Sequence, residues 1–74
     1  MKGIRNQILR TAEKLFLTQG YKTTTIRQIV QESGITSGSI YHIFEDKEHL
    51  FSALVDEFLT NAKAKIDKAL EGQP

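Results

Sequence analysis

A short stretch of the sequence, residues 36–42, gathers side chains that donate hydrogen bonds. It carries four hydroxyl groups and one imidazole, and it has no acidic residue. Donors of this kind, without neighbouring carboxylates, suit contacts with phosphate oxygens and with the acceptor groups on the edges of DNA bases. A glycine among them would let the backbone approach such a surface closely. The candidate contact residues in this stretch are Thr36, Ser37, Gly38, Ser39, Tyr41 and His42.

Other groups of reactive side chains lack the spacing that catalysis or metal binding needs. His42 and His49 flank Asp46, but an expected helix break beside the aspartate separates them, and no third strong ligand is near. Asp56 and Glu57 are neighbours on a helix, so their carboxylates point about 100° apart and cannot share a proton. We therefore expect no catalytic residue, no metal site and no cofactor, and we predict that the protein is not an enzyme.

Basic residues are concentrated in the first part of the chain. Residues 1–30 contain six lysines and arginines, Lys2 among them, against one acid, whereas residues 31–74 contain four basic and eight acidic residues. The net charge of the whole chain is only +1. A basic half favours a surface that faces a polyanion such as DNA. A solvated helix face would carry the same charges, so composition alone does not separate the two interpretations.

The length of 74 residues allows one small domain and excludes a two-domain cleft or a barrel with an enclosed site. The chain has no cysteine, so apolar packing must hold the fold together. No apolar run approaches the ~18 residues of a membrane span, and no signal-peptide core follows the start. The sequence therefore predicts a cytoplasmic protein that does not contact a membrane.

The elements that position the candidate residues are all expected to be helices. Apolar residues recur at helical spacing, and the single proline stands at the very end. Two short helices joined by a glycine-containing turn, at residues 25–44, predict a helix-turn-helix unit. The fold class is therefore all-α, a three-helix helix-turn-helix domain followed by a long fourth helix. The predicted helices are 4–19, 26–32, 37–44 and 47–70.

Local residue types mark the ends of these helices. Gly20 and Gly34 are expected to end the first two in the left-handed conformation, which glycine adopts without steric cost. Hydroxyl and carboxylate side chains are expected to cap the N-termini of the second, third and fourth helices, since their oxygens accept from free backbone N–H groups. The predicted N-caps are Thr24 or Thr25, then Thr36, then Asp46.

Helical spacing also identifies a core and a second apolar face. In the first three helices the inward residues are Ile4, Ile8, Leu9, Ala12, Leu15, Phe16, Ile26, Ile29, Val30, Ile40, Ile43 and Phe44. The face of the last helix that is expected to cover this core consists of Leu50, Phe51, Leu54 and Phe58. A second stripe is rotated by roughly 100° and consists of Val55, Leu59, Ala62, Ile66 and Leu70. A helix that buries two faces normally has two partners, and the small core cannot reach the second stripe.

The order and spacing of many residues between positions 8 and 51 follow one known pattern. These residues are Ile8, Leu9, Leu15, Phe16, Gly20, Tyr21, Thr24, Thr25, Ile26, Arg27, Ile29, Gly34, Ile35, Ser37, Gly38, Ser39, Ile40, Tyr41, Phe44, Lys47, Glu48 and Leu50. With them the chain resembles the N-terminal DNA-binding domain of the TetR family of bacterial transcriptional regulators.

The resemblance implies a function and roles for single residues. It implies that residues 37–44 lie in the major groove of double-stranded DNA and that Thr24, Thr25, Tyr41 and Lys47 contact phosphates. It further implies a sequence-specific transcriptional regulator, most simply a repressor, that binds a palindromic operator as a homodimer.

Four positions depart from the family pattern. Val30 and Ser33 stand where alanine is usual, so the helix crossing at Val30 is expected to shift slightly. Ser37 replaces a frequent basic residue, which removes a contact to a base or phosphate. Ile43 replaces a histidine or tyrosine and is expected to turn inward and enlarge the core.

Members of that family carry a second, all-helical domain that binds a small-molecule effector and forms the dimer. We therefore expect residues 1–51 to be the DNA-binding domain and residues 47–74 to be a connecting helix toward such a domain, with the chain a piece of a longer regulator. A naturally short protein is the alternative. A second functional hypothesis is a helical protein-interaction module that uses the apolar stripe of the last helix.

Overall fold

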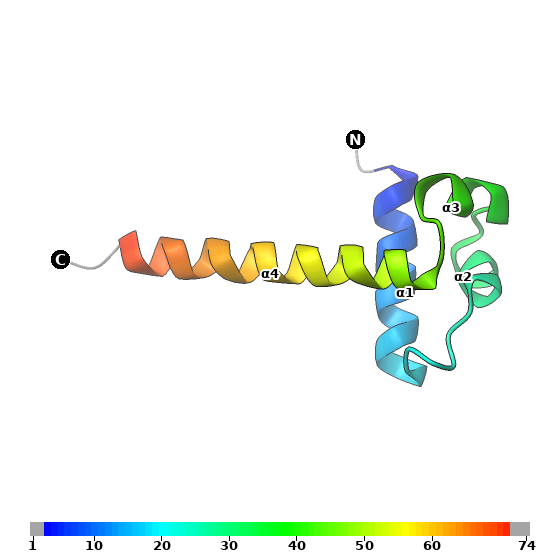
Figure 1. The fold of residues 1–74 in the computed structure, drawn as a ribbon, viewed down its shortest axis with the longest axis horizontal. Coiled ribbons are helices and arrows are strands. Elements are labelled where there is room, and N and C mark those ends of the chain that lie inside the picture. The colour runs from blue at the N-terminus through cyan, green and yellow to red at the C-terminus, as the bar shows by residue number, and fades with distance from the viewer. Residues whose placement is uncertain (1–2, 72–74) are drawn as a thin grey trace.

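The computed structural model describes residues 3–71 and contains four helices and no strand in that range. This confirms the predicted all-α fold, in which a three-helix unit is followed by one long helix (Figure 1). Lys2 and the last three residues of the 47–74 segment lie outside the described residues. The helices are α1 (Ile4–Gln19), α2 (Ile26–Ser33), α3 (Ser37–Ile43) and α4 (Lys47–Glu71).

Side-chain caps set the beginnings of the last three helices. Thr25 caps α2 in a reciprocal arrangement: its Oγ1 accepts from the N–H of Gln28 at 3.2 Å, and the Gln28 side chain accepts from the N–H of Thr25 at 3.0 Å. Thr36 caps α3, and an oxygen of Asp46 accepts from the first turn of α4, as predicted. Helix α3 ends one residue earlier than predicted because Phe44 is already extended.

Two glycines with positive φ follow the first two helices. Gly34 has φ 74° and ψ 7°, the left-handed helical conformation that was predicted, and its N–H donates to the carbonyl of Val30. Gly20 also has positive φ, at 92°, but its ψ of 156° lies outside the predicted left-handed helical region. This conformation is essentially restricted to glycine. It turns the chain directly from α1 into the extended segment that precedes α2.

Replacing Gly34 with alanine is expected to lower the free energy of unfolding by about 1–2 kcal/mol, because a Cβ atom is disfavoured at this φ. Gly38→Ala is the matched control, since Gly38 lacks a positive φ and an added Cβ there meets no atom within 4 Å. That change should raise stability by about 0.5–1 kcal/mol, because alanine favours a helix over glycine. Urea denaturation followed by circular dichroism measures the change in the free energy of unfolding for both variants. Changes of the same sign would contradict the left-handed role assigned to Gly34.

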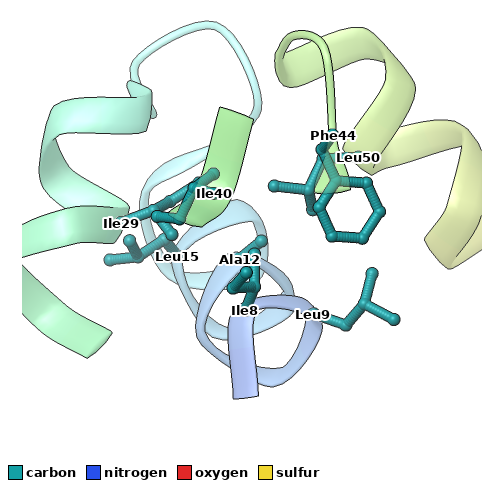
Figure 2. Packing of buried hydrophobic residues seen from close by; sticks show 8 residues of the cluster. All are labelled: Ile8, Leu9, Ala12, Leu15, Ile29, Ile40, Phe44 and Leu50. Atoms are coloured by element: carbon teal, nitrogen blue, oxygen red, sulfur yellow. The ribbon is translucent and has the colours of Figure 1, made fainter. Parts of the chain in front are cut away.

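Helix α1 is the element on which the other three helices pack (Figure 2). Its inner face meets side chains from α2, from α3 and from the first turn of α4. The buried apolar residues are Ile8, Leu9, Ala12, Leu15, Ile29, Ile40, Phe44 and Leu50. Each of them belongs to the predicted core. Partly buried around them lie Phe16, Ile26, Val30, Ile35, Ile43, Ala53 and Leu54.

Three residues predicted to lie in the core are instead largely at the surface. The side chains of Ile4, Phe51 and Phe58 are 47%, 43% and 70% exposed. The reason for the two phenylalanines is the direction of α4, which crosses α1 steeply and then leaves the bundle (Figure 1). Only Leu50 is fully buried on this helix, and Leu54 is half-buried. Helical periodicity therefore identified the correct face of α4 but not how far that face stays covered.

The second apolar stripe of α4 lies away from the core, as predicted. Val55, Leu59, Ile66 and Leu70 are exposed, and the small Ala62 is half-buried. Val55 lines a groove with residues of α1, and the later part of α4 projects beyond the other helices in Figure 1. Within residues 3–71, none of the helices combines the length and apolar character that a membrane crossing demands.

Candidate nucleic-acid interface

Helix α3 presents one face to the core and the other to solvent. Ile40 is fully buried, and Ile43 packs partly against the core, as its departure from the family pattern predicted. The exposed residues of the helix are Ser37, Gly38, Tyr41 and His42. None of these residues is an aspartate or a glutamate. The core contacts therefore hold a short helix whose outer side offers hydrogen-bond donors and no carboxylate.

The hydroxyl groups of Thr36 and Ser39 differ in whether their hydrogen is still free to donate to a ligand. Thr36 Oγ1 accepts from the N–H of Ser39 at 3.3 Å and donates to Ser39 Oγ at 3.0 Å, so the cap uses its hydrogen. Ser39 Oγ accepts that bond and keeps its own hydrogen for another partner. Thr36 therefore positions α3, and Ser39 is the better donor toward a ligand.

The two threonines before α2 have opposite roles. Thr25 is exposed, and because its oxygen accepts the cap, its hydroxyl hydrogen can donate outward. Thr24 is fully buried, and its hydroxyl donates to the carbonyl of Gly20 at 2.7 Å. A buried hydroxyl that is already bonded cannot reach a phosphate, so the predicted contact by Thr24 is corrected. Its role is to hold the turn between α1 and α2.

Lys47 is held at the start of α4 by the turn that follows α1. Its Nζ donates to the carbonyl of Tyr21 at 2.7 Å and lies 4.1 Å from the centre of the Tyr21 ring. An ammonium group has three donor hydrogens, and the carbonyl takes one of them. Lys47 is half-buried, and the two further hydrogens can serve a phosphate oxygen. The contacts with Tyr21 thus give the Lys47 ammonium group a defined position, while its phosphate contact stays a prediction.

Tyr21 joins this lysine to an aromatic cluster. Its ring centre lies 5.3 Å from that of Phe16 and 4.9 Å from that of Phe51. Partial burial, together with the negative charges of Glu48 and Asp46, raises the pKa of Tyr21 above its ordinary value. The sequence analysis assigned Tyr21 only to the family pattern and missed its contact with Lys47, which joins residues far apart in the chain.

Two basic residues of α1 are engaged within the molecule. Arg10 forms ion pairs with Glu13, at 3.0 Å, and with Glu57 of α4. Lys14 pairs with Glu32 of α2 at 3.3 Å. These contacts support the solvated-face interpretation for this part of the basic stretch. The predicted polyanion-facing surface is correspondingly narrower than the count of basic residues indicated.

Lys22 and Arg27 are basic residues that the sequence prediction left out of the interface. Both are exposed, and they flank Thr25 at the start of α2. A lysine and an arginine beside a capping threonine suit phosphate contacts. Their position next to the predicted cap is the signal by which the sequence could have identified them. We include both in the candidate interface.

The histidines do not form part of a metal site among the described residues. No group of three or more histidine and acidic side chains within residues 3–71 is arranged to hold a metal ion. His49 Nδ1 accepts from the N–H of Glu45 at 3.2 Å, and its ring packs on Phe44 at 5.6 Å between centres. His49 therefore stabilises the α3–α4 turn, while His42 lies on the exposed side of α3.

Comparison with known proteins agrees with the family resemblance that the sequence pattern indicated. The family model described as bacterial regulatory proteins, tetR family, matches residues 8–54. The HTH-type transcriptional regulator HbdR of Aromatoleum sp. is 40% identical over 68 residues, which cover 92% of this chain and 30% of that protein. The HTH-type transcriptional repressor KstR2 of Mycolicibacterium smegmatis is 40% identical over 55 residues, covering 74% and 27%. The HTH-type transcriptional repressor AcnR of Corynebacterium glutamicum is 42% identical over 53 residues, covering 72% and 28%. The chain spans less than a third of the length of these relatives.

Proposed function

Because the chain belongs to the TetR family of bacterial regulatory proteins, we propose that it is the DNA-binding part of a transcriptional regulator. The observation that carries this proposal is the exposed, acid-free face of α3, which the core holds in place through the buried Ile40 and the partly buried Ile43. In a helix-turn-helix unit the second short helix enters the major groove while the first crosses the phosphate backbone. Here α3 is the helix that would enter the major groove, and α2 is the helix that would cross the phosphate backbone.

The proposed interface divides into two groups of residues. Phosphate contacts come from groups around the starts of α2 and α4, namely Lys22, Thr25, Arg27 and Lys47, and from Tyr41 on α3. Base contacts come from the outer side of α3, namely Ser37, Gly38, Ser39 and His42. Thr36 supports the residues of α3 through its cap of that helix. Such a division separates affinity, which phosphates supply, from sequence preference, which base edges supply.

The wider properties of the regulator are also proposals. Residues 1–51 act as the DNA-binding domain and residues 47–74 as the connection to a ligand-binding and dimerisation domain. We infer a homodimer on a palindromic operator, with a small-molecule effector bound in that second domain. Repression is favoured because two of the relatives above are named repressors. Action on bacterial DNA places the protein in the cytoplasm, and its role there is regulatory rather than catalytic.

Binding of a fluorescently labelled duplex at low salt tests the proposal. Three basic contacts, from Lys22, Arg27 and Lys47, predict a slope of log affinity against log salt of about −2.7. Affinity should then fall about 40-fold between about 50 and about 200 mM salt. Polarisation measures the binding, and circular dichroism confirms the fold in each buffer. A folded chain that binds no duplex at low salt would contradict the proposal.

Alanine variants separate the two groups of contacts. Lys47→Ala should weaken binding to every sequence alike and reduce the salt slope by about 0.9, because one phosphate contact is lost. Ser37→Ala and His42→Ala should instead change the ranking of sequences, by at most roughly 1–3 kcal/mol for each base contact. Selection from a random duplex library measures the ranking. Identical preferred sequences for the wild type, Ser37→Ala and His42→Ala would remove both residues from base recognition.

A helical protein-interaction module is the second candidate, favoured by an exposed groove between α1 and α4. Its apolar walls include Leu17 and Phe58, which are 81% and 70% exposed. A Tyr41→Ala/Lys47→Ala double variant distinguishes the candidates. If it binds DNA as the wild type does while the chain binds a helical partner through this groove, the interaction module is the better assignment.

A further inference from the structure

A shallow hollow lies where the beginning of α1 meets the exposed side of α3. Its volume is about 400 Å³, and it is lined by Ile4, Gly38, Ser39, His42 and Ile43. The residues that line it include three of the four proposed base contacts. The hollow is therefore part of the surface that would meet the DNA bases.

The lining combines apolar surface with hydrogen-bond donors. Ile4 is 47% exposed although it is a large aliphatic residue, and Ile43 is half-buried beside it. Ser39 keeps a hydroxyl hydrogen because Thr36 donates to its oxygen. No charged residue lines the hollow. A ligand group that fits must present an apolar part next to an acceptor.

Gly38 supplies an independent observation. Its φ is not positive, and a Cβ added there would meet no protein atom within 4 Å. Neither backbone conformation nor internal packing therefore requires glycine, although glycine is unfavourable within a helix. The absence of a side chain keeps the hollow open. Close approach of another molecule accounts for a glycine at this position.

We propose that the hollow is a subsite for one thymine of the operator. Thymine is the base whose major-groove edge carries a methyl group beside an acceptor, the O4 atom. The C5-methyl group rests against Ile4 and Ile43, and O4 accepts from Ser39 or His42. Cytosine offers no methyl group at this edge, so it would leave the apolar wall of Ile4 and Ile43 uncovered. This inference rests on the proposed function, because α3 must lie in the major groove.

The test removes only the methyl group. Duplexes that bind the chain are first selected from a random library at low salt, and each thymine is then replaced singly by deoxyuridine. Loss of one buried methyl is expected to weaken binding about fourfold at one thymine of the site and not at the others. Polarisation titrations with the wild-type chain measure the ratio of thymine to deoxyuridine affinity at each position.

Variants of the residues that line the hollow test whether the hollow causes the difference between thymine and deoxyuridine affinity. Ile4→Ala and Gly38→Ala should bind the thymine and deoxyuridine duplexes equally, since the first removes an apolar wall and the second fills the space. Leu17→Ala is the matched control, because it shortens an exposed aliphatic side chain on α1 outside the hollow and should keep the fourfold ratio. Melting curves by circular dichroism confirm that each variant is folded.

The outcomes separate this inference from the proposed function. Duplex binding without enrichment of any sequence, or without a deoxyuridine effect at any thymine, overturns the thymine subsite and leaves DNA binding intact. A fourfold ratio that persists in both Ile4→Ala and Gly38→Ala also overturns it. A folded chain that binds no duplex overturns the proposed function and the subsite with it.

Discussion

Replacing Phe44 with alanine is expected to remove about half of the stability of the fold. The side chain is only 1% exposed and lies in the core between α1 and the first turn of α4 (Figure 2). It also packs against the guanidinium of Arg5 and the ring of His49, each 5.6 Å from its ring centre. A buried Phe→Ala change costs about 3–5 kcal/mol, because it loses burial and leaves a cavity. A chain of this length has a total free energy of unfolding of roughly 4–11 kcal/mol. Urea denaturation followed by circular dichroism measures the loss.

Phe58→Ala is the matched control for this prediction. Phe58 is also an aromatic residue, but it is 70% exposed on α4 beyond the covered turns. Its replacement should change the free energy of unfolding by no more than about 0.5 kcal/mol. Comparable midpoints for the two variants would show that the core differs from the one described above.

The second large effect is expected in hydrogen exchange along α4. Amides at the buried centre of α1 and α2 should exchange only through global opening, roughly a thousandfold or more slower than in an unfolded chain. Amides of residues 60–70 should exchange at nearly the unfolded rate in a monomer. Leu59, Ile66 and Leu70 are exposed there, and an isolated helical segment of this length is marginal in water. Exchange read by NMR at low protein concentration resolves the two regions.

Concentration serves as the control for this experiment. Protection of residues 60–70 that grows with protein concentration would show that the apolar stripe pairs with a second copy. Slow exchange throughout this segment in a demonstrated monomer at high dilution would refute the prediction, because the stripe would then be satisfied within the chain.

Features that depend on a few neighbouring residues could be predicted from the sequence. The caps at Thr25, Thr36 and Asp46 follow from a side-chain oxygen near the first free N–H groups of a helix, and the structure has each of them. Gly34 follows from the same kind of local argument. The inner faces of the first three helices were predictable because their spacing is helical and the helices pack together over most of their length.

Features that depend on how distant segments meet could not be predicted in this way. The exposure of Phe51 and Phe58 results from the steep crossing of α1 and α4, which periodicity does not encode. The burial of Thr24 results from a turn whose geometry is set by Gly20. Lys47 meets Tyr21 only after α4 has docked. For the candidate site, the residue types on α3 indicated hydrogen-bond donors. Which donor hydrogens remain free for a ligand could be decided only from the hydrogen bonds in the structure.

The crossing of α1 and α4 also has a mechanical consequence. Helix α4 contains 25 residues and is fixed to α1 near residues 51–57 by the Phe16–Phe51 contact and the Arg10–Glu57 ion pair. Measured from residue 54, midway between these contacts, and at a rise of 1.5 Å per residue, the arm toward Glu71 is about 25 Å long and the arm toward Lys47 about 10 Å. The crossing can thus serve as the fulcrum of a lever with unequal arms. A sideways displacement of the long arm by about 5 Å would move the Lys47 end by about 2 Å in the opposite direction, with about 2.5-fold greater force. Movement at the far end of α4 would therefore reach the proposed phosphate contact of Lys47 reduced in size and increased in force.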